Sequence, residues 1–297
     1  MNKFKVTAVI AGIAALLIGI VLMISGLKFG ASPFVSIGKN ASVTDREIID
    51  GTVDIEEFDE LILGVSSIDV KVVKGNGYSL EYHAREDNIP EVKQKGKKLE
   101  IVQKPSSWVL LDFRSIGYSG EQYYVLTIPD NDKMYKGELK CSSGSISLDG
   151  FNMNGSVLAS SGEINIANSI CDKLNLTLSS GDIRLENGEF GTLELALSSG
   201  DVVSDGCRTQ NLKVGLTSGT VTFNDLTADN VECGLTSGDL MIQLNGAPSD
   251  YDVNLKATSG EIVFDGKEID GSYTERASSG KKIDVHCTSG DIDISFK

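Results

Sequence analysis

Hydrophobic and polar residues alternate over most of the chain, and from residue 141 onwards this alternation is part of a repeat. A Ser/Thr-Ser-Gly triplet recurs at spacings of 18, 19, 19, 19, 19, 22, 20 and 10 residues. The positions seven, five and three residues before each glycine, and two and four residues after it, are mostly Leu, Ile or Val. A period of two predicts β-strands with one buried face. The glycines of the triplets are Gly144, Gly162, Gly181, Gly200, Gly219, Gly238, Gly260, Gly280 and Gly290.

Each repeat is therefore expected to contain a strand, the Ser-Ser-Gly turn, a second strand and a second turn. Pairs such as Asp149-Gly150 and Asn187-Gly188 mark the second turn. One strand pair cannot bury its apolar side alone, whereas identical units stacked at about 4.8 Å bury it in continuous ladders. The pattern thus predicts an all-β fold, a β-solenoid (β-helix) of about eight to nine coils. An antiparallel meander or sandwich also fits the period of two, but it does not explain why each residue type recurs at the same phase.

The end of the repeat array is irregular. After Gly280 the apolar residue comes one position late, and Gly290 follows after only 10 residues, too few for a coil. We therefore expect the C-terminus to form the capping turn that a solenoid requires. The triplet glycines are expected to adopt positive φ angles or to lie where no Cβ fits. The neighbouring Ser and Thr hydroxyls are expected to hydrogen-bond within turns and ladders rather than to act as nucleophiles.

The N-terminus carries a candidate membrane segment. Val6 to Leu27 is a run of 22 residues without a charge, bounded by Lys5 and Lys28. As a helix it would be ~33 Å long, enough for a hydrocarbon core of ~30 Å. A cleaved signal peptide is the alternative, but its apolar region would be shorter, about 7–15 residues. We therefore expect a single-pass protein of the cell membrane, with the bulk of the chain extracytoplasmic.

The chain divides into four predicted regions. Residues 1–28 are the cytoplasmic tip and transmembrane anchor, and residues 29–57 form a tether. Residues 58–140 form a strand-rich N-terminal cap, and residues 141–297 form the β-solenoid repeats. Strands of the cap are expected near residues 78–83, 99–103 and 123–128.

Charge and composition narrow the possible chemistry. The chain has 27 Lys and Arg residues against 42 Asp and Glu residues, a net charge of −15. Nucleic-acid binding is excluded, because it requires Lys and Arg to replace condensed counterions. The chain has only two histidines and five cysteines, which are few for His-based catalysis or a zinc cluster. We therefore assign no catalytic residue and no cofactor from the sequence.

The cysteines follow the phase of the repeat. Cys141, Cys233 and Cys287 fall on inward positions, where cysteine acts as a small hydrophobic residue. Cys171 and Cys207 lie near the second turn, two coils or about 10 Å apart, beyond the ~7 Å Cα limit for a disulfide. No intrachain disulfide is expected.

Acidic residues directly follow most of the triplet glycines. Stacked carboxylates repel each other, and a hard cation such as Ca²⁺ relieves this, so Asp182, Asp201 and Asp239 are a candidate cation ladder. The alternative is that each carboxylate hydrogen-bonds the backbone of its own turn. The full set is Glu163, Asp182, Asp201, Asp239, Glu261 and Asp291.

A long apolar segment separates two predicted strands of the cap. Residues 104–122 contain the only tryptophan of the chain, and Trp108, Phe113 and Tyr118 are candidates for contact with a partner. The alternatives are that these side chains plug the open end of the solenoid, or that the segment is disordered.

An N-terminal anchor, a strand-rich opening, a Val-Leu-Thr-Ile-Pro segment at residues 125–129 and tandem Ser-Gly-Asp-Ile-type repeats resemble a known family. This is the bacterial "putative adhesin" family of β-strand-repeat proteins, and the resemblance covers about residues 50–297. It implies a membrane-anchored envelope protein facing the cell wall, with no assigned molecular function. Some members are similar to proteins encoded with envelope-stress systems. The family provides no catalytic or binding residues to transfer.

Three classes of function are compatible with these features. The first is a non-enzymatic adhesion or scaffold module that contacts an envelope protein or a cell-wall polymer. The second is envelope-stress sensing, or regulation of a membrane protein. The third is a β-helical polysaccharide lyase or hydrolase, which would need paired carboxylates or an Arg/Lys cluster in a cleft. The repeats contain no such cluster, and the first class is favoured.

Overall fold

The computed structural model describes residues 48–103, 121–277 and 280–297. Ile49–Lys104 and Gln122–Lys297 belong to one compact unit, which contains the stacked strands. In the described ranges no helix is both long and apolar enough to cross a membrane. The predicted anchor at residues 1–28 lies outside these ranges, and residues 48–54 of the predicted tether form the first strand.

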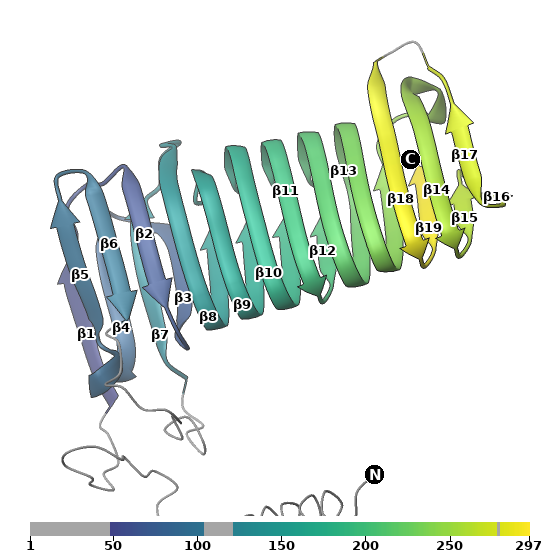
Figure 1. Cartoon of the computed structure of the whole chain (residues 1–297). Helices are drawn as coiled ribbons and strands as arrows, with labels where there is room; N and C mark the ends of the chain where they lie inside the picture. The colour runs from purple at the N-terminus through teal and green to yellow at the C-terminus, as the bar shows by residue number, and fades with distance from the viewer. Residues whose placement is uncertain (1–47, 104–120, 278–279) are drawn as a thin grey trace, which may run out of the picture. The chain divides into compact units, whose positions relative to one another are not determined.

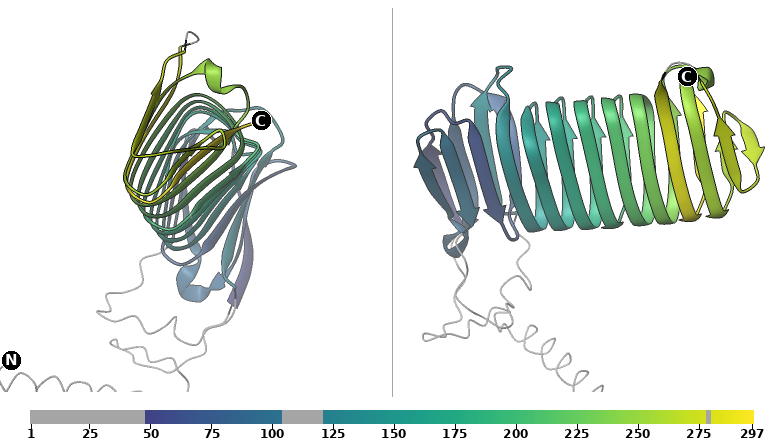
Figure 2. Two further views of the ribbon diagram at one scale, coloured as in Figure 1. Left: turned by 90° about the vertical axis from the view of Figure 1, so that its right-hand side faces the viewer. Right: turned by 45° about the horizontal axis from the view of Figure 1, so that its top comes forward.

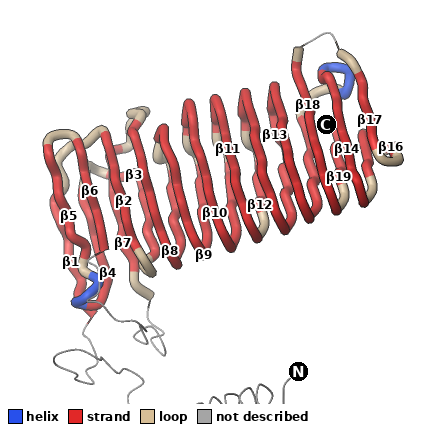
Figure 3. Tube along the Cα trace, in the orientation of Figure 1, coloured by secondary structure: helices blue, strands red, loops and turns tan. Residues whose placement is uncertain are grey.

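Nearly all of the described chain is β-strand (Figure 3). The N-terminal strands are β1 (Ile48–Asp54), β2 (Glu60–Val65), β3 (Asp69–Gly75), β4 (Ser79–Arg85), β5 (Pro90–Lys95), β6 (Lys98–Gln103) and β7 (Tyr123–Pro129). The repeats form β8 (Tyr135–Asp149), β9 (Met153–Ala167), β10 (Ile170–Glu186), β11 (Glu189–Ser199), β12 (Val202–Asp205) and β13 (Arg208–Leu244). The C-terminal strands are β14 (Tyr251–Ser259), β15 (Ile262–Phe264), β16 (Lys267–Ile269), β17 (Ser272–Glu275), β18 (Lys281–Ser289) and β19 (Ile292–Phe296).

Strands of successive repeats pair in parallel and in register (Figure 1). Leu176 of β10, for example, pairs with Val157 of β9 on one side and with Leu195 of β11 on the other. Each residue therefore pairs with the residue at the equivalent position of the repeat in the neighbouring coil. This confirms the predicted all-β solenoid and excludes an antiparallel meander for the repeats.

Each coil contributes one strand segment before its triplet glycine and one after it. In end-on view the coils form a flattened oval (Figure 2). We call its two broad sides the pre-glycine face, which includes β2 and β11, and the post-glycine face, which includes β3 and β12. Leu, Ile and Val side chains point between the faces, and inward residues such as Leu174, Leu193 and Ile183 are fully buried. Burial of these apolar ladders is the main stabilising contribution.

The triplet glycines stack on one another with no space for a side chain. Gly200 has a φ of +127°, and a Cβ there would lie 1.7 Å from the carbonyl oxygen of Gly181. The same contact recurs with φ between +119° and +144° at Gly162, Gly181, Gly219, Gly238, Gly260 and Gly290. Gly144 begins the column against the backbone of Ile68. Gly280 is different: a Cβ there would meet no atom within 4 Å, so this glycine lies outside the column.

The second turn is marked by a column of residues that tolerate a left-handed backbone. Asn168, Asn187 and Asp225 have φ angles of 51°, 51° and 55°. Gly150 and Gly206 occupy the same phase with φ angles of 67° and 65°. Backbone bonds join these turns from coil to coil, such as the 3.0 Å bond from the Asn187 N–H to the Asp205 carbonyl. Asn, Asp and Gly are the residues that adopt this conformation at least cost.

The C-terminus does not form the end of the stack. β18 and β19 pair in parallel with β13 on one side and with β14 and β15 on the other. In Figure 1 these yellow strands lie between the green strands β13 and β14. The expected C-terminal capping turn is therefore wrong. The physical reason is that Ile283, Val285 and Ile292 are fully buried, so this coil needs an apolar neighbour on both sides.

The N-terminal end has the same interleaved order. β2 lies between β6 and β8, and β3 lies between β7 and β8, all in parallel. At both ends antiparallel strands cover the outermost coil: β4 and β5 at one end, with β1 paired to the far edge of β4, and β16 and β17 at the other end. Pro90 and the exposed Lys93 and Lys95 of β5 disfavour pairing of this edge with another chain.

Aromatic side chains fill the space inside the two ends. Phe58 packs against Tyr78 and Tyr135 with ring centroids 5.3 Å and 5.2 Å away, and Tyr135 stacks on Phe151 at 4.9 Å. At the other end Phe264 contacts both Tyr273 and Phe296. These rings close the core where the regular aliphatic ladders stop.

The glycine column makes a prediction about single substitutions. Replacing Gly200 with Ala should lower the free energy of unfolding by at least about 2 kcal/mol, because a left-handed backbone and a backbone clash are both imposed on the new Cβ. Gly234→Ala is the matched control: its Cβ would meet no atom within 4 Å and its backbone is ordinary. That variant should be neutral or stabilised by about 0.5–1 kcal/mol. If the two variants shift the midpoint of urea denaturation equally, the close stacking of the triplet glycines is contradicted.

The interleaved C-terminus makes a second prediction. Truncation after Glu275 removes β18 and β19, and β14 and β15 then lose their parallel neighbour. Amide hydrogen exchange should become fast in Tyr251–Phe264 as well as in the last coil of β13, because both are edges without the inserted coil. Exchange that stays slow in Tyr251–Phe264 would show that the inserted coil is a dispensable cap.

Candidate functional site

The aromatic contact candidates Trp108, Phe113 and Tyr118 lie outside the described residues. The residues that flank their segment are well defined. The Gln103 side-chain amide donates to Asn88 Oδ1 over 2.9 Å, and Asn88 Nδ2 donates to Gln122 Oε1 over 2.8 Å. The Gln103 Oε1 atom also accepts from the Ser66 N–H at 2.6 Å. One buried asparagine therefore holds together the two points at which the segment leaves and rejoins the body.

The acidic residues after the triplet glycines hydrogen-bond the neighbouring coil. Asp201 Oδ1 accepts from the Thr220 N–H at 2.8 Å, and Asp182 Oδ1 accepts from the Asp201 N–H at 3.3 Å. The same bond joins Asp239 to the Asp291 N–H and Asp291 to the Glu261 N–H. The carboxylates of Asp182, Asp201, Asp239 and Asp291 thus bond the next turn, whereas the Glu163 carboxylate accepts from Asn165 Nδ2 in its own strand. No group of three or more His, Cys, Asp or Glu residues in the described ranges could hold a metal ion.

The Ser and Thr residues of the triplets differ from expectation. All of those paired with a stacked glycine are exposed, and in the described structure their hydroxyls make no hydrogen bond to the protein. The backbone explains this, because main-chain groups of neighbouring turns bond each other directly, as from the Gly200 N–H to the Ser218 carbonyl at 3.2 Å. These hydroxyls are therefore free for solvent.

Each of the two histidines lies beside a carboxylate. His83 Nδ1 lies 2.6 Å from Asp50 Oδ1, and its ring stacks on Tyr123. His286 Nε2 lies 3.1 Å from Asp284 Oδ1. Among the described contacts, neither ring bonds a hydroxyl or a thiol that it could activate. All five cysteines are free and buried, and burial raises the pKa of the Cys233 thiol to about 12.

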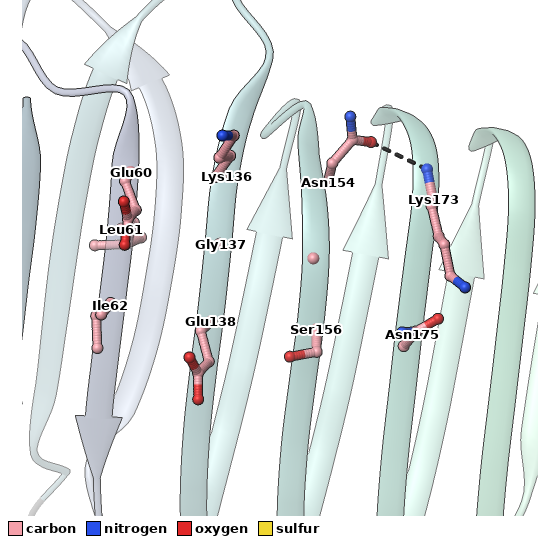
Figure 4. A pocket seen from close by; sticks show the side chains of 11 residues that line it. Glu60, Leu61, Ile62, Lys136, Gly137, Glu138, Asn154, Ser156, Lys173 and Asn175 are labelled. Atoms are coloured by element: carbon pink, nitrogen blue, oxygen red, sulfur yellow. Dashed lines mark hydrogen bonds between the residues drawn. The ribbon is translucent and has the colours of Figure 1, made fainter.

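The pre-glycine face carries a shallow groove that follows the solenoid axis, which we call the axial groove. It consists of two hollows of about 570 Å³ and 500 Å³ that share Asn175. The first, over β2, β8, β9 and β10, is lined by Glu60, Leu61, Ile62, Lys136, Gly137, Glu138, Asn154, Gly155, Ser156, Lys173 and Asn175 (Figure 4). The second, over β10, β11 and β13, is lined by Asn175, Leu176, Thr177, Glu194, Leu195, Ala196, Lys213, Val214, Gly215, Glu232 and Gly234.

Two inward-facing glycines underlie the first hollow. Gly137 and Gly155 pair with each other. The residues at the same position in the coils on either side are Leu61 and Leu174. A Cβ on Gly155 would lie 1.9 Å from the Gly137 carbonyl oxygen. Without inward side chains these two strands can lie closer to the core, and the outer surface is hollowed over them.

Most of the charged side chains along the axial groove are paired with one another. Lys98 lies 2.7 Å from Glu60, Lys140 lies 2.5 Å from Glu138, and Lys173 lies 3.1 Å from Glu194. The bond to Glu60 raises the pKa of Lys98, and the bond from Lys140 lowers the pKa of Glu138. Lys213 and Glu232 continue the series at 3.2 Å. The groove therefore carries little net charge.

Asparagine side chains occupy the centre of the groove. Asn154 Oδ1 accepts from the Asp172 and Lys173 N–H groups at 2.7 Å and 3.0 Å, which fixes its orientation (Figure 4). Asn175 is different, because its Oδ1 atom is buried and has no hydrogen-bond partner within the described residues. A buried acceptor without a donor calls for an explanation, and a ligand or a water molecule is the usual one.

The two broad faces differ in charge. The outward columns of the pre-glycine face balance seven lysines against seven acids: Lys98, Lys136, Lys140, Lys173, Lys213, Lys256 and Lys282 against Glu60, Glu100, Glu138, Glu194, Glu232, Asp252 and Asp284. The post-glycine face and its adjoining turn are strongly acidic, with Lys71 and Arg184 against Asp149, Glu163, Asp182, Glu186, Asp201, Asp205, Asp239, Glu261, Asp291 and Asp293. The groove thus lies on the neutral side of an acidic protein.

The repeat itself contains a signal for this groove. Thr177, Ala196, Gly215 and Gly234 all lie four residues before a triplet glycine, at an outward strand position. Small residues at one outward phase in successive repeats predict a depression along the stack. The unpartnered state of Asn175 could be found only from the structure.

The chain was compared with known proteins. A family model of Toastrack DUF4097 proteins matches residues 58–295. The solved structure of a "putative adhesin" from Bacteroides fragilis is 15% identical, with 84% of this chain and 97% of that chain covered and a TM-score of 0.50. A "putative lipid binding protein" from Parabacteroides distasonis is 16% identical, with 85% and 98% covered and a TM-score of 0.49. These identities show likeness of fold alone. No curated protein matches the chain.

The acidic column makes a prediction that separates backbone bonding from cation binding. Asp201→Ala should lower the free energy of unfolding by about 1 kcal/mol, because the Thr220 N–H loses its acceptor. Asp201→Asn keeps an acceptor oxygen and should have nearly the stability of the wild type. Millimolar CaCl₂ should leave the melting temperature of all three proteins unchanged. A calcium-dependent rise in the wild type that is absent in Asp201→Asn would instead establish the cation ladder.

Proposed function

Because the chain belongs to the Toastrack DUF4097 family, we propose that it is a non-enzymatic adhesion or scaffold module of the bacterial cell envelope. The match over residues 58–295 confirms the family resemblance seen in the repeats. The Bacteroides fragilis protein of similar fold is described as a "putative adhesin", which agrees with the proposal. Within the described residues, no His, Ser, Cys or carboxylate cluster forms a catalytic arrangement.

The observation that carries the proposal is the axial groove. It extends across five strands, β2, β8, β9, β10 and β11, and into β13, on a body held rigid by parallel ladders. An enzyme site is usually a deep pocket that excludes water, whereas this groove is shallow and open along its length. An open, elongated surface suits the binding of an extended partner. An envelope protein or a cell-wall polymer fits this description.

The proposed location of the module, outside the cytoplasm at the cell membrane, rests on the N-terminal segment of the sequence. Val6 to Leu27 is proposed to anchor the chain in the cell membrane as one helix, with the solenoid outside the cytoplasm. The acidic solenoid would be repelled by anionic lipid headgroups, so the anchor and not the body supplies the membrane attachment.

Residues 104–120 are proposed as a second contact with a partner. The support is the aromatic and aliphatic content of the segment in the sequence, together with the hydrogen bonds by which Asn88 joins the flanking residues Gln103 and Gln122. The edges of the outermost N-terminal coil are already occupied by β4 and β5, so a plug is not needed there. Trp108, Phe113 and Tyr118 are the side chains that would make the contact.

The proposal is tested with the full chain carrying a C-terminal epitope in bacterial cells. We expect the epitope to be in the membrane fraction, to be removed by protease added to intact cells, and to be retained on isolated cell walls or a captured envelope protein. A chain without residues 1–28 should leave the membrane fraction. An epitope protected from external protease, or absence of retention on any envelope component, would contradict the proposal.

The same assay includes the Trp108→Ser/Phe113→Ser variant. If these side chains contact a partner, the variant keeps its melting temperature and loses retention. A loss of stability would instead assign them to the solenoid end. The Ser142→Ala/Ser160→Ala variant, with changes at exposed triplet positions, is the control and should be retained like the wild type.

A further inference from the structure

Two glycines in the floor of the second hollow have no structural reason to be glycine. Gly215 and Gly234 lie at the same phase in the two coils of β13, on the outward side. A Cβ on Gly215 would come no closer than 4.0 Å to the Leu195 carbonyl oxygen, and one on Gly234 would meet nothing within 4 Å. Neither has the positive φ of the stacked glycines. Glycine inside a strand costs about 0.5–1 kcal/mol relative to Ala, so its use here indicates close approach of another molecule.

Asn175 provides an independent observation at the junction of the two hollows. Its Oδ1 atom is buried and accepts no hydrogen bond from the described chain, and the residue lines both hollows; Figure 4 shows its place in the first. A ligand with a hydroxyl or an amide N–H over this position would satisfy the acceptor. The hollow and the unpaired oxygen therefore both point to a polar ligand at the same place.

The surrounding charges indicate that this ligand is uncharged. Lys173 and Lys213 are neutralised by Glu194 and Glu232, at 3.1 Å and 3.2 Å. At the second hollow a charged ligand would have to break such a pair to gain a partner, whereas an uncharged ligand leaves both pairs intact. The groove is the neutral part of a chain whose net charge is −15. Charge complementarity thus favours a neutral polymer.

The architecture disfavours a peptide or an apolar helix. The strands run across the groove, and their backbone groups are used in the parallel ladders, so no free strand edge is available to pair with an extended peptide. The floor of the second hollow presents Thr177, Ala196 and glycines, which offer neither side-chain pockets nor the large apolar surface that a helix needs. A thin polymer with polar groups on its edges fits best.

We propose that the axial groove binds an uncharged polysaccharide strand with hydroxyl and amide groups, aligned with the solenoid axis. Asn175 Oδ1 accepts a hydrogen bond from the strand, and Gly215 and Gly234 leave space for a sugar ring against the sheet. The coils repeat every 4.8 Å or so along the axis, and a regular polymer can therefore contact several of them in the same way. This inference deepens the proposed function and rests on it, because it names the class of cell-wall polymer that the module would hold.

The test uses the full chain in detergent micelles with a soluble hexasaccharide of β-linked N-acetylglucosamine, an uncharged probe, measured by isothermal titration calorimetry. Gly215→Thr/Gly234→Thr fills the floor of the groove, and Asn175→Ala removes the acceptor. We expect each to weaken binding by about tenfold or more, with the melting temperature of the glycine variant unchanged or raised. Thr222→Gln, in the same coil as Gly215 but on the post-glycine face, should bind like the wild type.

Three results would overturn the inference. In the first, the wild-type chain does not bind the hexasaccharide. In the second, the groove variants bind it as tightly as the wild type does. In the third, an unrelated extended decapeptide displaces the hexasaccharide. Retention on isolated cell walls is measured in parallel. If the wild type and the groove variants are retained equally, the proposed adhesion function stands and only the groove assignment fails. If none is retained, the adhesion function fails as well.

Discussion

The structure depends on how closely one turn can approach the next. At every stacked triplet the carbonyl oxygen of one glycine lies where the Cβ of the following glycine would be, between 1.7 Å and 2.1 Å away, from Gly162 to Gly290. Only glycine allows the turn segments to keep the same spacing as the strands on either side. The parallel ladders, the continuous rows of buried Leu, Ile and Val, and the carboxylate bonds between turns all require that common spacing.

A stack of identical coils has two ends, and each end exposes both apolar side chains and unpaired backbone groups. Both ends of the stack are closed in the same way. The coil that comes first or last in the chain, β2–β3 or β18–β19, is placed one layer inside, and antiparallel strands cover the outermost coil. Threading a terminal coil between two others ties the end of the chain into the ladders, so fraying from a free end is opposed. Aromatic clusters around Phe58 and Phe264 complete the closure.

Once the interior is fixed, the outward positions are free to vary, and the two faces have diverged. The post-glycine face and the adjoining turn hold most of the acidic residues, some of which bond the next coil. The pre-glycine face is electrically balanced and hollowed, with the unpartnered Asn175 near its middle. The same repeat thus produces one strongly acidic side and one side with little net charge.

The repeat alone determined the fold class and the phase of nearly every strand. A period of two predicts a strand with one buried face, and a constant interval between triplets predicts parallel stacking, because both follow from local geometry. The sequence also located strands near residues 78–83, 99–103 and 123–128, which are β4, β6 and β7. Tertiary structure alone decided which coil lies next to which at the ends. Gly280 has the triplet pattern but lies outside the column. Gly290 comes after Gly260 in the sequence but lies between Gly238 and Gly260 in the column. The order of coils depends on which apolar surfaces are left to cover after the chain turns back, a long-range competition that no local pattern records. For the same reason the unpaired oxygen of Asn175 became visible only when side chains from separate coils were brought side by side.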